Sequence, residues 1–181
     1  MSYKIKKMIN KKMILSEYAS PFGVLVLGAC DESICLCLWK NACELMSGRV
    51  DERMSGGVDE GMSGGVLAEA KRQLELYFQG RLRVFQLPLL MTATGMTRRV
   101  LEALEDVPYG ETVTYGELAR RIGSPEAARA VGRALGRNPL HVIIPCHRVV
   151  AARGRGGYAG GVEHKAQLLE LEAGGVIPFL C

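Results

Sequence analysis

Residues 114–137, TYGELARRIGSPEAARAVGRALGR, decide the fold of the second half of this chain. Thr114 and Glu117 have the spacing of a capping box, in which the two side chains satisfy backbone N–H groups at the start of a helix. We expect this helix to cover residues 115–122. It should end at Gly123, because glycine readily takes the left-handed conformation that closes a helix.

A second helix is expected almost immediately afterward. Ser124 can cap it, Pro125 suits the first helical position, and the pattern continues to about Gly136. Two short helices joined by a tight turn predict a helix-turn-helix, a motif of many DNA-binding proteins.

The second helix has an unusual composition. It is rich in alanine and glycine, and arginines recur every four residues on one face, at Arg129, Arg133 and Arg137. Small residues let a helix backbone come close to a neighbour, and arginines supply phosphate contacts. We therefore interpret this helix as a DNA contact. The alternative is an alanine-rich helix packed in a core, with its arginines at the solvated edge.

The positive charge of the chain is concentrated around this helix. Residues 120–155 contain eight arginines and one acidic residue, Glu126, although the formal net charge of the whole chain is only +4. A basic segment of this kind is expected in a protein that binds a polyanion such as nucleic acid. A solvated basic face would have the same composition.

Length and composition exclude several classes of protein. The chain has 181 residues, of which 48% are hydrophobic and 23% charged, as expected for one or two globular domains. Its longest apolar stretch, residues 21–30, is shorter than the roughly 18 residues of a membrane-spanning helix. The apolar run after the N-terminal lysines is too short for a secretory signal. We expect a cytoplasmic protein without a membrane partner.

The first half of the chain predicts a small sheet with a helix. Two β-rich apolar runs within residues 20–39, separated by a turn at residues 31–33, indicate a hairpin. Residues 67–78 have helical spacing and end at Gly80, and residues 81–90 are expected to be extended. This half contains no motif that indicates chemistry.

The fold class follows from these patterns. We expect an α/β N-terminal domain over residues 1–92, made of a small sheet and a helix. It should be followed by a mainly helical, winged helix-turn-helix-like domain over residues 93–181 that binds DNA and carries the chemistry. An amphipathic helix over residues 95–106 should open this second domain.

A short repeat interrupts the first domain. The octapeptide MSGRVDER at residue 46 recurs as MSGGVDEG and then as MSGGV. Three copies of eight residues are too short for a solenoid, and their glycine and serine content disfavours packing. We interpret residues 46–66 as a flexible inserted loop without a function of its own.

Four of the six cysteines lie in the first half and raise the question of a metal site. Their spacing, C-x4-C-x-C-x5-C from Cys30, lacks the paired knuckles typical of structural zinc. Cys35 and Cys37 stand two apart in an apolar run, which is typical of a buried strand with both thiols on one face. We expect structural thiols rather than a metal site.

Chemistry is indicated near residue 146. Residues 141–145 predict a short buried strand that leads into Cys146, His147 and Arg148. A cysteine reacts as its thiolate, so it needs a base or a positive neighbour at neutral pH. Adjacent residues of a strand point to opposite faces, so His147 is expected to act on Cys146 through a bridging water rather than by direct contact. Taken alone, the Cys-His pair also fits a buried structural cysteine.

The complete string IPCHRVV, residues 144–150, resembles the active-site motif of the O6-alkylguanine-DNA alkyltransferases, also called methylated-DNA–protein-cysteine methyltransferases. The resemblance extends over about the last 110 residues, while the first half is only loosely similar. Further matching motifs stand in the family's order at residues 72–78, 108–115, 128–132, 138–139 and 158–161.

The resemblance implies roles for four residues in the chemistry. Cys146 would accept the alkyl group, and His147 would take its proton through a water. Glu172 would hold and polarise His147. Tyr115 would help to rotate the target nucleotide and would donate a proton toward the leaving guanine.

The resemblance also implies a DNA surface and a base pocket. Arg129 would enter the base stack in place of the extruded base, while the helix-turn-helix binds the minor groove. The other DNA contacts would be Ala128, Ala130, Gly132, Arg133 and Thr114. Asn138 would anchor the turn before the active-site segment, and the pocket would be lined by Tyr115, Leu135, Asn138, Val149, Tyr158 and Ala159.

The implied activity is direct reversal of DNA damage. A methyl or other alkyl group would pass irreversibly from O6 of guanine, and also from O4 of thymine, in double-stranded DNA to Cys146, once per protein. A monomer without metal or cofactor would suffice. Two alternatives remain open: a sensor that binds and flips the lesion without repairing it, and a cysteine hydrolase that uses Cys146 and His147.

The sequence departs from the family pattern at a few positions. Ala159 stands where a hydroxyl residue is common, so one contact to the substrate is expected to be missing. Aromatic residues are usual near Met96 and Leu101, so the packing there is expected to differ. None of these changes affects Cys146.

Overall fold

The N-terminal part of the chain forms a three-stranded antiparallel sheet. The computed structural model describes residues 13–46 and 62–174, and the sheet has the order β1-β2-β3. Its strands are β1 (Met13–Ser20), β2 (Gly23–Cys30) and β3 (Ser33–Trp39). The predicted hairpin is confirmed as β2 and β3. The sequence does not predict β1, because its residues are only half-buried and show a weak alternation of apolar and polar side chains.

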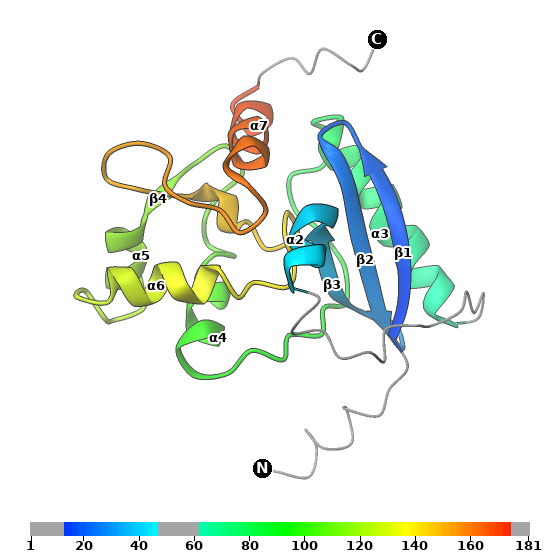
Figure 1. The fold of residues 1–181 in the computed structure, drawn as a ribbon, viewed down its shortest axis with the longest axis horizontal. Helices are drawn as coiled ribbons and strands as arrows, with labels where there is room; N and C mark the ends of the chain where they lie inside the picture. The colour runs from blue at the N-terminus through cyan, green and yellow to red at the C-terminus, as the bar shows by residue number, and fades with distance from the viewer. Residues whose placement is uncertain (1–12, 47–61, 175–181) are drawn as a thin grey trace.

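Two helices cover this sheet. α3 (Met62–Phe78) packs against all three strands, and α2 (Lys40–Met46) follows β3 directly (Figure 1). The predicted helix over residues 67–78 is therefore confirmed, but it begins earlier. The interpretation of residues 46–66 as an inserted loop is wrong at its C-terminal end, where α3 has already begun. The central part of the repeat lies outside the described residues.

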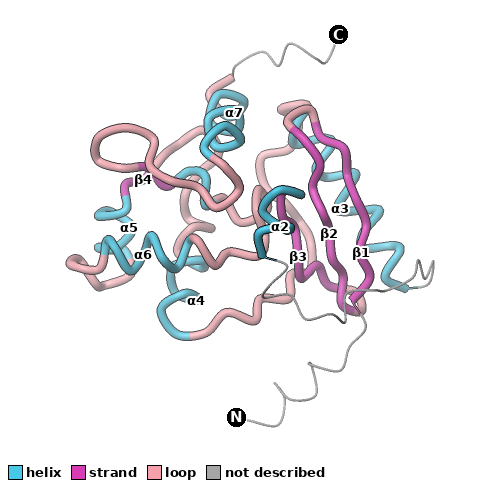
Figure 2. Tube along the Cα trace, viewed as in Figure 1, coloured by secondary structure: helices cyan, strands magenta, loops and turns pink. Residues whose placement is uncertain are grey.

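The C-terminal half is mainly helical, as predicted. Figure 2 shows long loops between its helices and strand only at short segments. The elements are α4 (Gly95–Glu102), β4 (Val113–Thr114), α5 (Tyr115–Arg121), α6 (Ala128–Leu135), β5 (Val149–Val150) and α7 (Val162–Glu172). β4 and β5 pair in parallel. α4 is shorter than the predicted helix over residues 95–106, because the chain turns after Glu102.

The helix-turn-helix consists of α5 and α6. The predicted capping box is confirmed, since the Glu117 N–H donates to Thr114 Oγ1 at 3.1 Å and the Thr114 N–H donates to Glu117 Oε2 at 2.7 Å. Gly123 takes φ +68° after α5, as a helix-ending glycine should. The predicted start of the second helix is wrong, because the Ala127 N–H closes a turn on the Ser124 carbonyl and α6 begins only at Ala128.

The two halves meet at the free edge of β3. The Ile34 N–H donates to the Pro88 carbonyl, and the Cys37 N–H donates to the Pro139 carbonyl, each at 2.8 Å. The His141 N–H in turn donates to the Cys37 carbonyl at 2.6 Å. Segments from the connection after α3 and from the loop after α6 thus satisfy an edge that would otherwise remain unpaired. The site described below is anchored to the sheet through this second segment.

The predicted strand over residues 141–145 is wrong. Leu140 makes a single bridge to Cys37, and then the chain turns, with hydrogen bonds from the Ile143 N–H to the His141 carbonyl and from the Ile144 N–H to the Leu140 carbonyl. All five residues are buried. Their apolar character therefore reflects burial of a tight loop rather than membership of a sheet.

Candidate functional site

Cys146 lies at the start of a single 3-10 turn, Cys146–Arg148, rather than on a strand. The preceding loop is strained, because Val142 has φ +71°, a conformation that β-branched residues rarely adopt. In a 3-10 turn, successive side chains point about 120° apart. His147 and Arg148 can therefore both turn inward behind the cysteine, which a strand would not allow.

A cavity of about 200 Å³ opens in front of the thiol. Of the six predicted pocket residues, Tyr115, Leu135, Tyr158 and Ala159 line it. Asn138 and Val149 lie behind its wall, at 1% and 0% exposure. The complete lining is Tyr115, Gly132, Leu135, Gly136, Cys146, Gly157, Tyr158 and Ala159. α6, the Cys146 turn and the loop before α7 thus share one concave site.

The thiol has polar neighbours. Asn138 Nδ2 donates to Cys146 Sγ at 3.0 Å, and the same amide group donates to the Ile144 carbonyl at 3.1 Å. Burial raises the pKa of Cys146 to about 11. The hydrogen bond from Asn138, a backbone N–H, the charge of Lys165 and the Tyr158 hydroxyl all oppose this rise. At neutral pH the resting residue is a protected thiol whose anion already has partners in place.

His147 is held by Glu172, as the family resemblance implies. His147 Nε2 lies 2.9 Å from Glu172 Oε1, and both side chains are buried. Burial lowers the pKa of His147, the carboxylate of Glu172 opposes this, and the charges of Arg148 and Lys165 lower it further. The imidazole is therefore neutral. With its Nε2 proton donated to Glu172, its Nδ1 lone pair accepts no hydrogen bond from the described residues.

Glu172 is the centre of a buried polar network. Arg148 Nε donates to Oε2 at 2.8 Å and Nη2 donates to Oε1 at 3.0 Å, while Tyr77 Oη donates to Oε1 at 2.7 Å. The Gly110 N–H adds a bond to Oε2 at 3.1 Å. Burial acts to raise the pKa of Glu172, but the bonds and charges of His147 and Arg148 prevail and hold it at about 2. Glu172 is thus a carboxylate at physiological pH.

Sequence reasoning missed three members of this site. Arg148 is paired bidentately with Glu172, Tyr77 reaches Glu172 from α3, and Lys165 donates to the Val149 carbonyl at 2.6 Å and the Gly157 carbonyl at 3.0 Å. Burial lowers the pKa of Lys165 to about 8. Arg148 and Tyr77 both lie in the motifs of the resemblance. Lys165 carries no sequence signal except its position on the inner face of the last helix.

Tyr115 is placed at the cavity mouth by the capping box. It is the first residue of α5, and its hydroxyl donates to the Gly157 carbonyl at 3.3 Å. A side chain at Gly156 would come within 3.0 Å of the Tyr115 ring, so the ring and the loop before α7 fit closely. Burial raises the pKa of Tyr115, which keeps its hydroxyl protonated as a donor.

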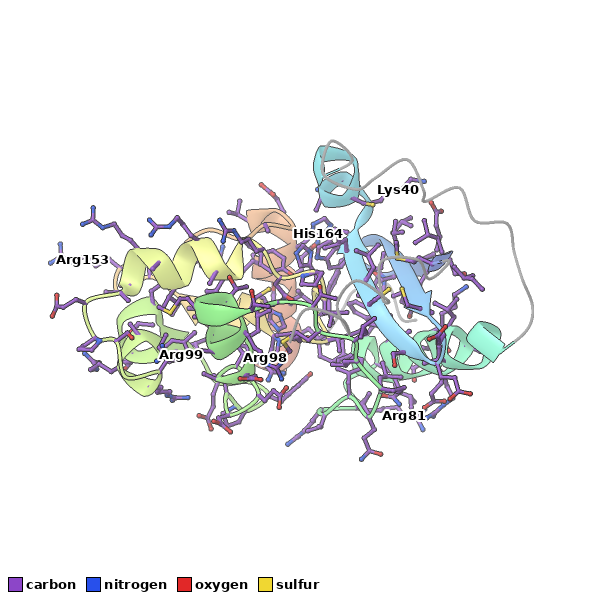
Figure 3. The ribbon with its side chains drawn as sticks, turned by 90° about the horizontal axis from the view of Figure 1, so that it is seen from below. Lys40, Arg81, Arg98, Arg99, Arg153 and His164 are labelled. Atoms are coloured by element: carbon purple, nitrogen blue, oxygen red, sulfur yellow. The ribbon has the colours of Figure 1, made fainter. Side chains whose placement is uncertain are left out.

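The predicted DNA-binding residues lie on α6, except Thr114, which caps α5. Arg129 and Arg133 are exposed, Ala128, Ala130, Gly132 and Thr114 are half-buried, and Val131, Ala134 and Leu135 face the core. Figure 3 shows Arg153 at the outer end of the same helical half, on the side of α6. Basic side chains therefore extend from the helix that also lines the cavity with Gly132 and Leu135.

Two features bear on cofactors and membranes. Within residues 13–46 and 62–174, no cluster of three or more histidine, cysteine or acidic side chains has a geometry that could hold a metal. In the same residues, no helix has the length and apolar character needed to cross a membrane.

Comparison with family models gives two matches. Residues 13–91 match the 6-O-methylguanine DNA methyltransferase, ribonuclease-like domain, and residues 95–174 match the 6-O-methylguanine DNA methyltransferase, DNA binding domain. The predicted fold class, a small α/β domain before a helical DNA-binding domain, is confirmed by these matches.

Two relatives have sequences similar to this chain over about three fifths of its length. A methylated-DNA–protein-cysteine methyltransferase of Methanosarcina acetivorans is 52% identical over 105 residues, which cover 58% of this chain and 67% of the relative. A protein of the same name from Mycobacterium leprae is 50% identical over 114 residues, covering 62% of this chain and 69% of the relative.

Solved structures extend the similarity to both halves. The crystal structure of Mycobacterium tuberculosis OGT in complex with DNA matches with a TM-score of 0.75 and 39% identity, over 87% of this chain and 91% of that one. The M. tuberculosis O6-methylguanine methyltransferase structure matches with a TM-score of 0.72 and 35% identity, over 91% and 94% of the two chains.

Proposed function

The chain belongs to the 6-O-methylguanine DNA methyltransferase family, and from this premise we propose how its own residues repair alkylated DNA. It is a methylated-DNA–protein-cysteine methyltransferase. We propose that it transfers a methyl or other alkyl group from O6 of guanine in double-stranded DNA to Cys146, irreversibly and once per protein.

One observation carries this proposal. The Cys146 thiol faces a cavity of about 200 Å³, and behind it stand a hydrogen-bond donor, Asn138, and a neutral histidine oriented by a carboxylate. A nucleophile, a base and a group that orients the base are the parts that covalent transfer to a thiol requires. The cavity can hold one planar base against the sulfur.

The first chemical step is removal of the thiol proton. Because the pKa of Cys146 is about 11, few molecules carry a thiolate at neutral pH, so the proton must leave when the substrate is present. His147 Nδ1 accepts it through one bridging water, and the Glu172 carboxylate stabilises the imidazolium that forms. Asn138 stabilises the thiolate by its hydrogen bond.

Alkyl transfer is then a displacement at carbon. The thiolate forms a C–S bond as the bond between the alkyl carbon and O6 breaks, and the electron pair of that bond stays on guanine. Guanine regains a proton on its ring, which the Tyr115 hydroxyl at the cavity mouth donates and recovers from solvent. The product is a thioether at Cys146. His147 cannot cleave this C–S bond, so each protein acts once.

The O6 position is covered in stacked duplex, so the base must be rotated out before it can reach the thiol. Extrusion costs a few kcal/mol, and minor-groove proteins commonly offset such costs with inserted side chains and phosphate contacts. Arg129, exposed on α6, is the residue we assign to the vacated stack. The half-buried Ala128, Ala130 and Gly132 let the helix approach the minor groove, with Arg133 and Thr114 contacting the backbone.

The remaining parts of the proposal follow from the same site. The cavity that takes guanine also admits the smaller ring of O4-alkylthymine. All residues of the proposed mechanism come from one chain, which supports a monomer. Cys30, Cys35, Cys37 and Cys146 are free thiols, as is usual in the cytoplasm, where we place the protein.

The test is the intact mass of the protein after incubation with duplex DNA that contains O6-methylguanine, followed by peptide mapping. We expect one added methyl group on the peptide with Cys146, with a plateau at one per protein. Tight binding of the lesion without a change in mass would instead support the sensor. Steady release of product with unmodified protein would support a hydrolase.

A further inference from the structure

His164, on α7, contacts two backbone carbonyls through its two ring nitrogens. Nδ1 lies 2.6 Å from the Gly160 carbonyl oxygen, and Nε2 lies 3.0 Å from the Phe22 carbonyl oxygen. A carbonyl oxygen only accepts hydrogen bonds. Both contacts can therefore be hydrogen bonds only when both ring nitrogens carry a proton, that is, when the side chain is an imidazolium.

The same ring is stacked on an indole. The rings of Trp39 and His164 have centroids 4.0 Å apart and lie within 4° of parallel. A cation over the face of a tryptophan is attracted by the ring electrons, so the stack also favours the charged form. Trp39 Nε1 in turn donates to the Tyr158 hydroxyl at 3.4 Å, which connects the stack to the cavity wall.

Glycines make room for this arrangement. A side chain at Gly23 would approach His164 Nε2 to 3.3 Å, and one at Gly160 would overlap the Trp39 indole. Gly23 also has φ +136°, which other residues rarely adopt. The backbone at Gly23 therefore lies directly against the His164 ring, and the backbone at Gly160 lies directly against the Trp39 indole.

The contact joins the two halves of the molecule at the wall of the cavity. Figure 3 shows His164 where the C-terminal helices meet the sheet. Gly160 directly follows Tyr158 and Ala159, which line the cavity, whereas Phe22 lies in the turn between β1 and β2. His164 thus connects the loop that contacts the base to a rigid sheet.

We propose that His164 is a positioning residue that acts as an imidazolium clamp, holding the cavity loop at residues 158–160 against Trp39 and the sheet. When His164 loses its proton at higher pH, one of the two carbonyls faces a lone pair, and the loop is released. This inference rests on the proposed function for its effect on alkyl transfer, but the clamp itself is independent of it.

Other titratable groups lie around His164. Burial, followed by the charges of His147 and His164, lowers the pKa of His141 to about 3, so His141 stays neutral. Burial raises the pKa of Tyr158 well above its usual value. Glu163 precedes His164 on α7. A Cβ at Gly161 would lie 3.5 Å from Glu163 Oε2 and 3.5 Å from His164 Nδ1, so an acidic side chain stands beside the imidazole.

Three further polar side chains stand near His164: two lysines, one on α2 and one on α7, and a neutral amide on α2. Lys40 pairs with Glu17 at 2.9 Å, and Lys165 points to the Val149 and Gly157 carbonyls. Asn41, whose amide lies near Gly161, does not titrate.

Trp39 allows the clamp to be tested directly, because it is the only tryptophan of the chain. A protonated imidazole in contact with an indole quenches its fluorescence more strongly than a neutral one. We expect the fluorescence of the wild-type protein to rise with pH, as the imidazolium is lost. The His164→Gln variant should be brighter and independent of pH. A rise of equal size in His164→Gln would refute the clamp.

The effect on function is tested by single-turnover transfer from O6-methylguanine duplex over the pH range of the fluorescence titration. The matched variant is His164→Arg, whose planar cation can stack on Trp39 and donate to both carbonyls at every pH. The rate ratio of wild type to His164→Arg cancels the titration of Cys146, and we expect it to fall about tenfold as pH rises.

The outcomes separate the two proposals. A ratio that does not change with pH would overturn the positioning role. Absence of transfer at every pH, with the fluorescence titration intact, would refute the proposed function and its pH effect but leave the clamp in place.

Discussion

Two buried thiols, Cys37 and Cys146, lie on opposite sides of the junction between the halves, at 0% and 4% exposure, and their surroundings differ. Burial raises the pKa of Cys37 far above its usual range, and the nearby Cys146 adds to the rise. Burial also raises the pKa of Cys146, but Asn138, a backbone N–H, Lys165 and Tyr158 limit it to about 11. The same residue type is thus inert in one half and poised for reaction in the other.

The difference extends to the packing of the two halves. Apart from the polar atoms of buried aromatic residues such as Tyr77, the buried polar side chains described in the N-terminal half are limited to Gln73, whereas those of the C-terminal half are Asn138, His141, His147, Arg148, Lys165 and Glu172. The sheet buries apolar surface, which stabilises without specifying chemistry. The helical half buries charges, which is costly unless each has partners, and the partners are what orient the base behind Cys146.

The largest effect should come from exchanging Cys146 for alanine. Cys146→Ala should abolish alkyl transfer, because no other described thiol faces the cavity, and it should leave lesion binding within about threefold. Intact mass and binding to O6-methylguanine duplex would measure both. The matched control is Cys37→Ala, which should transfer normally and lose about 1 kcal/mol of stability. Methylation of Cys146→Ala at any other residue would contradict the assignment of Cys146 as the reactive thiol.

Glu172→Gln should have the next largest effect. It removes the charge that orients His147 and pairs with Arg148, so transfer should slow by about 100-fold. Because the pKa of Glu172 is depressed from 4.5 to about 2, its carboxylate contributes about 3 kcal/mol of stability, present above about pH 4.5 and lost as pH falls to about 2. Denaturant unfolding at several pH values should show that the variant loses less stability than the wild type as the pH falls over this range.

Glu170→Gln is the control for this variant, since Glu170 is an exposed acid on the same helix. This control variant should keep the transfer rate of the wild type and its loss of stability at low pH. If Glu172→Gln also kept the wild-type transfer rate and the wild-type loss of stability at low pH, the buried network would have no role in the chemistry.

Local signals were sufficient for much of the fold. The capping box at Thr114 and Glu117, the helix end at Gly123 and the hairpin up to Trp39 each depend on residues close in sequence. The loop over residues 141–145 could not be predicted, because an apolar run reads the same whether it is a strand or a buried turn. The choice depends on β3, which pairs with this part of the chain at a single bridge, between Cys37 and Leu140.

The candidate site shows the same limit more sharply. Cys146, His147 and Glu172 were identified through the family resemblance, and the structure brings His147 and Glu172 together. The contact of Tyr77 with Glu172 joins residues 95 positions apart, and no spacing rule reports it. The strand assignment placed the side chains of adjacent residues on opposite faces, whereas the 3-10 turn lets both His147 and Arg148 contact Glu172.

Arg129→Ala tests whether the helical half does more than hold the thiol. Transfer from duplex DNA should slow by about 10- to 100-fold, because extrusion of the base is no longer offset by an inserted side chain. Transfer from the free base O6-benzylguanine should change by less than about threefold, because a free base needs no extrusion. Single-turnover rates with both substrates measure this.

The control is Arg98→Ala, which removes an exposed arginine that is paired with Glu102 on α4. Its rates should match the wild type on both substrates. An equal loss on duplex and free base in Arg129→Ala would assign the arginine to the pocket instead of the DNA.

The smallest expected effect concerns the hydrogen bond that Asn138 donates to Cys146. Asn138→Ala removes the amide that donates to Cys146 Sγ at 3.0 Å, and this bond lowers the pKa of the thiol. The pKa of the variant should therefore lie further above its usual value, and transfer from O6-benzylguanine near neutral pH should slow by about tenfold.

The pH profile separates this electrostatic role from a structural one, since Asn138 also holds the turn through the Ile144 carbonyl and the Leu140 N–H. If the amide acts on the thiolate, the ratio of variant to wild-type rate should begin to rise as the pH passes about 11, where the wild-type thiol ionises, and should approach one only above the higher pKa of the variant thiol. A ratio that stayed constant with pH would mean that Asn138 only shapes the loop. In that case the reactivity of Cys146 would depend on Lys165, Tyr158 and the His147–Glu172 pair, and the comparison with Cys37 would rest on them alone.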